Sequence, residues 1–201
     1  MTTNVARSED YERFGPCNLA RLIGRDYLGP RTGRLSMNDR DTGFVEYFTA
    51  RSEAMRGTAY LLCGDWHRAE DLVQNAFTKL YLVWGRVSRH EVLDAYVRQV
   101  LVRLYLDERR RGWWRRERVT SRPPVDRSTP PDAPANRLMV LQALAAVPPR
   151  QRAVLVLRYW EDLSIEETAA LLHCSAGTVK SQAARGLDSM RTLLMASAPP
   201  W

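Results

Sequence analysis

The chain has 201 residues and a net charge of +7, and 45% of its residues are apolar and 26% charged. This composition is typical of a soluble globular protein with one or two small cores. No apolar run approaches the ~20 residues that a membrane-spanning helix needs, and the first residues lack the apolar core of a secretory signal. We therefore expect a cytoplasmic protein with no membrane insertion.

The basic balance favours a polyanionic partner, either nucleic acid or an anionic membrane surface, without choosing between them. The three cysteines, Cys17, Cys63 and Cys174, are widely spaced and contain no CxxC pair, which argues against a disulfide framework. The three histidines are equally scattered. We therefore expect no metal ion and no cofactor.

Residues 1–42 contain many glycines and show no sustained periodicity, so they are predicted to form a mostly disordered extension. Met37 stands just before the first well-patterned helix, and one hypothesis is that translation starts there. Mass spectrometry of the native N-terminus tests this hypothesis, and a peptide from residues 1–36 would rule it out.

Helical periodicity predicts a first domain at residues 43–115. Apolar residues recur at helical spacing until Gly64 interrupts the pattern. Asp65 is placed to cap a second helix at residues 66–84, and a third helix is predicted at about residues 92–111. Each of these helices has one apolar stripe, which indicates a small bundle.

Most of the excess positive charge lies at the end of this domain. Between Arg98 and Arg122 there are nine arginines and three acidic residues, with Trp113 and Trp114 among them. Arginines attract phosphates, and flat aromatic rings can stack on unpaired bases. A solvated basic tail is the plain alternative.

A proline-rich linker is predicted at residues 116–136, because five prolines lie within residues 121–136 and exclude a helix or a central strand there. The linker separates the first domain from a second helical domain at residues 137–196. No segment shows convincing two-residue alternation, so the predicted fold is all-α: two small helical domains joined by a proline-rich linker.

The second domain is predicted to contain four helices. The apolar run at residues 154–157 could be a strand, but its neighbours extend a helical face instead. The helices are expected at residues 138–147, 150–160, 164–172 and 175–194.

The last two of these helices have the layout of a helix-turn-helix. Ser164 caps the first, a three-residue turn follows, and Ser175 caps the second. The small Ala169 allows a close crossing, and Val179 packs back onto the first helix. The alternative is an ordinary helical hairpin with a solvated polar face. The outward face of the last helix offers donors suited to base edges and phosphates, namely Thr178, Lys180, Ser181, Gln182 and Arg185.

Three segments together resemble the extracytoplasmic-function (ECF) RNA polymerase sigma factors, and most of all an actinobacterial SigE-like subgroup. They are AYLLCGDWHRAEDLVQNAFTKLYLVW at residues 59–84, DAYVRQVLVRLYLDERRRGWWRR at residues 94–116, and PPRQRAVLVLRYWEDLSIEETAALLHCSAGTVKSQAARGLDSMR at residues 148–191. The resemblance covers nearly all of the patterned chain.

The resemblance implies a sigma factor that binds core RNA polymerase and directs promoter recognition and transcription initiation. Residues 43–115 would be the region 2 domain, which binds polymerase and the −10 element. Residues 137–196 would be the region 4 domain, whose helix-turn-helix binds the −35 element. The implied partners are core RNA polymerase, promoter DNA and an anti-sigma factor, and the implied protein is not an enzyme.

The resemblance also assigns residues. The residues implied to bind polymerase are Glu70, Asp71, Leu72, Val73 and Gln74. The residues implied to bind the −10 element are Trp84, His90, Arg98, Arg103, Arg109 and Arg110. The residues implied to bind the −35 element are Thr178, Lys180, Ser181, Gln182, Ala184 and Arg185.

Three departures from the family pattern matter. Gln74-Asn75 stands in place of Gln-Glu, and docking is expected to survive this change. Arg103 stands where the family commonly has Asn, which bears on base preference. His173 stands where the helix-turn-helix usually has Gly, so its backbone must either avoid positive φ or adopt it at a cost.

Two other classes of function remain as alternatives. A stand-alone helix-turn-helix transcriptional regulator shares the TVK signature near the turn, but it would be accompanied by a sensor domain upstream, which this sequence does not show. An enzyme acting on nucleic acid would need clustered acids or histidines, or a phosphate-binding glycine loop, and none is visible.

Overall fold

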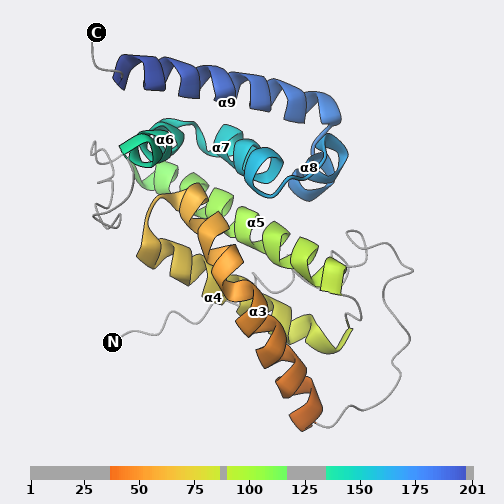
Figure 1. Ribbon diagram of the computed structural model, residues 1–201. Helices are drawn as coiled ribbons and strands as arrows, with labels where there is room; N and C mark the ends of the chain where they lie inside the picture. Colours follow the sequence, from red (N-terminus) through yellow and green to blue (C-terminus); the bar gives the residue numbers. More distant parts are fainter. Residues whose placement is uncertain (1–36, 87–89, 117–134, 198–201) are drawn as a thin grey trace.

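The computed structural model describes residues 37–86, 90–116 and 135–197, and every regular element in these ranges is helical (Figure 1). The all-α prediction is confirmed. The first bundle consists of α3 (Met37–Cys63), α4 (Trp66–Val83), the short 3-10 helix η2 (Trp84–Arg86) and α5 (His90–Arg116). The second bundle consists of α6 (Ala135–Ala146), α7 (Pro149–Leu155), the π-helix η3 (Val156–Trp160), α8 (Ile165–Leu172) and α9 (Ala176–Ser197).

The helix boundaries differ from the predicted ones mainly at the ends. Residues 37–42, predicted as part of the extension, form the first turns of α3, and α5 continues to Arg116. The rest of the predicted extension, residues 1–36, lies outside the described residues, as do residues 117–134 of the predicted linker.

The corner between α3 and α4 follows from local sequence. Gly64 has a φ of 74°, and its N–H donates to the carbonyl of Tyr60 at 2.7 Å, a helix end that glycine adopts without strain. Asp65 then accepts from the N–H of Arg68 at 2.9 Å, which is the predicted N-cap. The ring of Trp66 stacks on Tyr60 at 4.1 Å between centroids, so the corner is fixed on both sides.

The second bundle is built around α9, which lies across α6, α7 and α8 (Figure 1). Its approach to α7 depends on Gly186, because a Cβ at that position would lie 3.0 Å from Cδ1 of Leu155. Pro149 begins α7, where the missing N–H costs no hydrogen bond. The apolar run at residues 154–157 is helical, as predicted, and it spans the end of α7 and the start of η3.

The two bundles pack against each other. In Figure 1, α5 lies between the rest of the first bundle and α7 and α8 of the second, and contacts join α3 to α6, α7 and η3 and α5 to α7 and α8. One continuous core contains Tyr105 and Leu101 from α5 together with Leu157 and Leu171 from the second bundle. Helical periodicity alone did not reveal this shared core.

Candidate nucleic-acid interface

The helix-turn-helix begins with a complete capping box at Ser164. Its hydroxyl oxygen accepts from the N–H of Glu167 at 3.1 Å, and the Glu167 carboxylate accepts from the N–H of Ser164 at 2.7 Å. The backbone N–H of Ser164, followed by the Ser164 hydroxyl, lowers the pKa of the Glu167 carboxyl, since both favour its charged form. The first helix of the motif is therefore fixed at its start by its own sequence.

The turn between α8 and α9 adopts the left-handed conformation at His173, with φ 51° and ψ 51°. The N–H of Cys174 donates to the carbonyl of Ala169 at 3.0 Å, which ends α8 in the usual way. A residue with a Cβ is strained there. His173 therefore adopts the positive φ that the family's usual glycine would adopt freely.

Ser175 caps α9 through its hydroxyl, which accepts from the N–H of Thr178 at 3.1 Å. Val179 is buried and packs against Val154 and Ala169. These contacts hold the second helix of the motif against the first, as the sequence predicted.

The outward face of α9 is solvent-exposed. Gln182 is half-buried, and no salt bridge within the described residues holds Lys180 or Arg185. Such a face can offer hydrogen bonds and positive charge to a DNA groove without rearrangement. The exposed members of the predicted −35 set are Thr178, Lys180, Ser181, Ala184 and Arg185.

The predicted polymerase-binding residues divide into two groups on α4. Leu72 and Val73 are each 1% exposed and belong to the core, so their side chains form no outer surface in this structure. Asp71 and Gln74 are exposed, and Glu70 is half-buried. The candidate surface therefore consists of the polar members alone.

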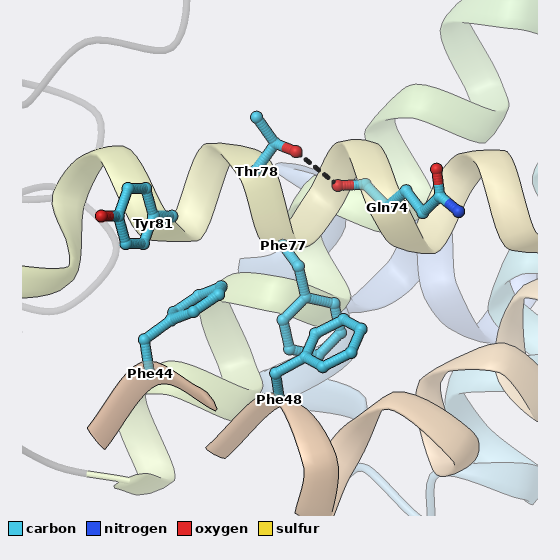
Figure 2. Close-up of a pocket in the computed structure, with 6 residues that line it drawn as sticks. All are labelled: Phe44, Phe48, Gln74, Phe77, Thr78 and Tyr81. Carbon is cyan, nitrogen blue, oxygen red and sulfur yellow. Dashed lines mark hydrogen bonds between the residues drawn. The ribbon is translucent and has the colours of Figure 1, made fainter. Parts of the chain in front are cut away.

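An open groove of about 440 Å³ continues this surface (Figure 2). Gln74 and Thr78 lie at its rim on α4, where the Thr78 hydroxyl donates to the carbonyl of Gln74 at 2.8 Å. The side chains of Phe44 and Phe48 project from α3 toward α4 and line the groove from that side. Sequence reasoning placed these aromatic residues in helical stripes and did not show that they leave a groove. The lining residues are Phe44, Phe48, Gln74, Phe77, Thr78 and Tyr81.

Two of the predicted −10 residues lie near the start of α5. The Trp84 ring packs against Phe44 and Tyr47, with centroids 5.4 and 5.5 Å apart, so it is half-buried against the first bundle. His90 begins α5, but its side chain lies outside the described residues, together with residues 87–89.

Asp94, close to the start of α5, is firmly anchored to α3. The carboxylate of Asp94 accepts from the Tyr47 hydroxyl at 2.7 Å and lies 2.9 Å from the guanidinium of Arg51. Burial, followed by this hydrogen bond, raises the pKa of Tyr47. Asp94 therefore ties α5 to α3.

The four predicted −10 arginines lie in different environments. Arg98 forms an ion pair with Glu161, and Arg103 contacts His173. Arg109 lies over the ring of Tyr105 at 5.7 Å. Arg110 is exposed. The backbones of residues 113 and 114 belong to α5, but their side chains lie outside the described residues, so stacking by either tryptophan stays a prediction.

Sequence reasoning missed the residues through which the second bundle meets α5, above all Glu161. Glu161 follows a π-helix that no periodicity rule predicts, and its partners lie far away in the sequence. Its N–H donates to the carbonyl of Val156 at 3.1 Å, the five-residue step of a π-helix.

The described residues contain neither a metal-binding cluster nor a helix that could span a membrane. No group of three or more histidine, cysteine or acidic side chains there is arranged to hold a metal ion. Within the same ranges, no helix has the length and apolar character needed to span a membrane.

The all-helical fold and the capped motif with its exposed donor face define a DNA-binding protein of the helix-turn-helix class. Residues 48–115 match the family Sigma-70 region 2, and residues 137–190 match the family Sigma-70, region 4. The chain therefore belongs to the sigma-70 family, among its SigE-like ECF sigma factors.

Curated relatives support the same family. The RNA polymerase sigma-E factor of Streptomyces coelicolor is 37% identical over 160 residues, which cover 76% of this chain and 86% of that protein. The ECF RNA polymerase sigma factor SigE of Mycolicibacterium smegmatis is 33% identical over 145 residues, covering 68% of this chain and 55% of that protein.

Solved structures share the fold at low sequence identity. The sigma factor RpoE of Bartonella quintana, crystallised in complex with the anti-sigma factor NepR, matches with a TM-score of 0.64 and 23% identity over 78% of this chain and 99% of that one. CnrH, in complex with the cytosolic domain of CnrY, matches with a TM-score of 0.56 and 18% identity over 90% of this chain and 99% of that one. As a sigma factor, this chain binds core RNA polymerase and directs promoter recognition and transcription initiation.

Proposed function

We propose that three surfaces of this sigma factor have separate functions: α4 docks on core polymerase, α5 binds the −10 element and α9 reads the −35 element. The observation that carries the proposal is the exposed donor face of α9 on a fully capped helix-turn-helix. The chain itself catalyses no reaction and works in the cytoplasm. Strand opening draws on binding energy from captured bases, without nucleotide hydrolysis.

The −35 surface acts through direct contacts in the major groove. Thr178 and Ser181 supply short hydroxyl groups close to the N-terminus of α9, where backbone N–H groups also favour phosphate. Lys180 supplies positive charge for the DNA backbone, and the fork of Arg185 can donate two hydrogen bonds to one guanine.

The polymerase surface combines charge with an apolar depression. Asp71 and Gln74 are exposed beside the groove, and Gln74 belongs to both features. A partner helix with an apolar residue facing the groove and a basic residue facing Asp71 would match this surface. The buried Leu72 and Val73 hold α4 in place beneath it.

The −10 surface is the basic side of α5. Arg98, Arg103, Arg109 and Arg110 project from one helix, and together they attract the phosphates of the opened strand. Neither DNA-binding surface needs high affinity alone, because polymerase and the linker raise the effective concentration of each surface at its DNA site.

An anti-sigma factor is a further partner in this proposal. The sigma factor RpoE, which has the same fold, was crystallised with a partner named as an anti-sigma factor, and CnrH was solved in complex with the cytosolic domain of CnrY. Co-purification of this chain from its native cells, followed by mass spectrometry of the bound proteins, identifies such a partner. Recovery of polymerase subunits alone would argue against one.

Run-off transcription tests the proposed function as a whole. Core polymerase is incubated with genomic promoter fragments, with and without this chain, and discrete transcripts are expected only with it. A chain that binds promoter DNA but neither co-purifies with core polymerase nor starts transcription would be a stand-alone regulator instead.

A further inference from the structure

The groove between α3 and α4 is open among the described residues (Figure 2). Phe77 lines it and is also part of the core, with 2% exposure, whereas Phe44 and Phe48 are only half-buried. Tyr81 is 39% exposed, and its hydroxyl donates to the carboxylate of Asp41 at 2.8 Å. Aromatic surface that remains in contact with water favours an apolar occupant, because its burial is favourable.

The edge of the groove on α4 is polar and acidic. Asp71, Gln74 and Thr78 follow one another at spacings of three and four residues, so they share one face of the helix. All three are exposed. No salt bridge among the described residues involves the Asp71 carboxylate. The matching occupant therefore carries apolar side chains for the groove and a cation for Asp71.

A stretch of the chain's own N-terminal sequence has this combination of residues. Residues 19–28 read LARLIGRDYL, in which two arginines flank the apolar pair Leu22 and Ile23. Four arginines and one acidic residue lie within residues 19–34, so the stretch is opposite in charge to Asp71. These residues lie outside the described ones. By sequence, they match both the apolar groove and its acidic edge.

The chain is long enough to bring residues 19–28 to the groove. The helix α3 begins at Met37, and Phe48 lies about three turns along it, which corresponds to about 16 Å. Residues 29–36 join the stretch to Met37 and span up to about 28 Å when extended. The stretch can therefore fold back over the groove. Because it is tethered, its effective concentration there is on the order of millimolar.

We propose that residues 19–28 occupy the groove between α3 and α4 in the free protein, with Leu22 and Ile23 against its aromatic side chains and a flanking arginine beside Asp71. This inference rests on the proposed function of the groove in polymerase binding. Core polymerase and the N-terminal stretch then compete for one surface. The apparent affinity of the chain for polymerase is reduced to the fraction of molecules in which the groove is free.

Photo-cross-linking in the free, full-length chain tests whether the groove is occupied. The photoreactive residue p-benzoylphenylalanine replaces Thr78 on the rim, or Thr49 as the matched control, which is exposed on α3 outside the groove. We expect the probe at Thr78 to link to residues 19–28 of the same chain, identified by mass spectrometry, and the probe at Thr49 to give no such link. If the Thr78 variant lacks a wild-type circular dichroism spectrum, the probe replaces Gln74 instead.

Leu22→Glu tests the consequence for polymerase binding. The variant brings a carboxylate to aromatic carbon, so it should lose the cross-link from the probe at Thr78. Its affinity for core polymerase should rise about tenfold if about nine-tenths of the free wild-type chains have an occupied groove. Leu35→Glu makes the same change outside the stretch and should keep both the cross-link and the wild-type affinity. Surface-immobilised polymerase measures the two affinities.

Several results would overturn the inference. They are the absence of a link from Thr78 to residues 19–28, a link that joins two copies of the chain, and a polymerase affinity that is unchanged in Leu22→Glu or equally raised in Leu35→Glu. A native N-terminus at Met37 would overturn it as well, because the stretch would not exist. Cross-linking uses no polymerase, so its failure leaves the proposed function intact, whereas a wild-type chain that does not bind polymerase would overturn the proposed function itself.

Discussion

At the scale of single residues, Arg152 is a buried cation that joins three segments of the chain. Its side chain donates to the carbonyls of Leu62, Ala145 and Val147, and the residue is 3% exposed. Burial lowers the pKa of its guanidinium. From the sequence, Arg152 looks like an ordinary arginine on a helix. Its acceptors are backbone carbonyls, which leave no pattern in the sequence that would identify a buried arginine.

Replacement of Arg152 by methionine should destabilise the protein by about 2–4 kcal/mol, because buried carbonyls lose their donors. Urea unfolding followed by circular dichroism measures the loss. Arg150→Met, an exposed position on α7, is the control and should change stability by less than about 0.5 kcal/mol. Equal stability of the two variants would contradict the assigned role.

Arg185 carries the sharpest residue-level prediction for function. Arg185→Ala should weaken binding to the −35 duplex by about 1–3 kcal/mol if its fork reads a base. Arg137→Ala removes the same charge from α6, outside the helix-turn-helix, and should have little effect. Competition binding with promoter fragments measures both variants. Unchanged −35 affinity in Arg185→Ala would remove Arg185 from the reading face.

At the scale of elements, local sequence predicted the caps correctly, because their signals span only a few residues. Asp65, Ser164 and Ser175 all accept the backbone hydrogen bonds expected of them. The groove between α3 and α4 was not predictable, since Phe44 and Phe48 show only that one face is apolar. Glu161 was missed because its partners are distant in the sequence.

The capping box at the start of α8 should make stability depend on pH. The pKa of Glu167 is lowered in the folded state, so its contribution is full above the unfolded pKa of about 4.3 and is lost as the pH falls through the folded value. Ser164→Ala should cost about 1 kcal/mol at pH 7.

Unfolding in urea, repeated from pH 7 to below pH 4, measures this dependence. The difference between wild type and Glu167→Gln should shrink at the acidic end, because the Glu167 carboxylate becomes protonated. Glu166→Gln, one residue away, is the control and should keep the wild-type profile. A difference that stayed constant across the range would argue against the Glu167 contribution.

The groove beside Gln74 should contribute to polymerase binding. Thr78→Arg places a bulky cation at its rim and should weaken association with core polymerase at least about tenfold, a cost of roughly 1.4 kcal/mol. Thr49→Arg is closely matched, since the Thr49 hydroxyl also donates to the carbonyl four residues earlier, at 2.8 Å, outside the groove. Surface-immobilised polymerase measures both affinities. Equal binding by the two variants would show that the groove is not part of the polymerase-binding surface.

Charge reversal tests the polar part of the same surface. Asp71→Arg should abolish assembly with core polymerase while the circular dichroism spectrum stays that of the wild type, because Asp71 is exposed. Glu53→Arg, on the exposed side of α3, changes the net charge equally and should still assemble. Gel filtration of the mixture separates the two outcomes, and normal assembly by Asp71→Arg would contradict the docking site.

At the scale of the whole molecule, sequence and structure give different views of how the parts relate. The sequence divides into two patterned segments, which were predicted as separate domains. The structure joins them through a common core that includes Leu101 and Leu157. Hydrophobic periodicity reports which face of a helix is buried, but it does not report which neighbour buries it.

The shared core predicts that the free chain unfolds in one cooperative transition. Differential scanning calorimetry should give a van't Hoff enthalpy close to the calorimetric enthalpy for wild type. In Glu161→Ala, which leaves Arg98 without its carboxylate partner, the transition should broaden or split in two. Two well-separated transitions in the wild-type chain would show that the bundles unfold independently.

The π-helix η3 sets the angular relation between the two halves of the second bundle. Its five-residue hydrogen bond from Glu161 to Val156 accommodates one residue more than an α-helical turn would. Deletion of a single residue from this stretch would restore an ordinary turn and rotate everything beyond it by about 100°. Glu161 would then swing away from Arg98, and α9 would present a different side to the DNA. The orientation of the helix proposed to read the −35 element thus depends on the length of a segment outside the proposed DNA-binding residues.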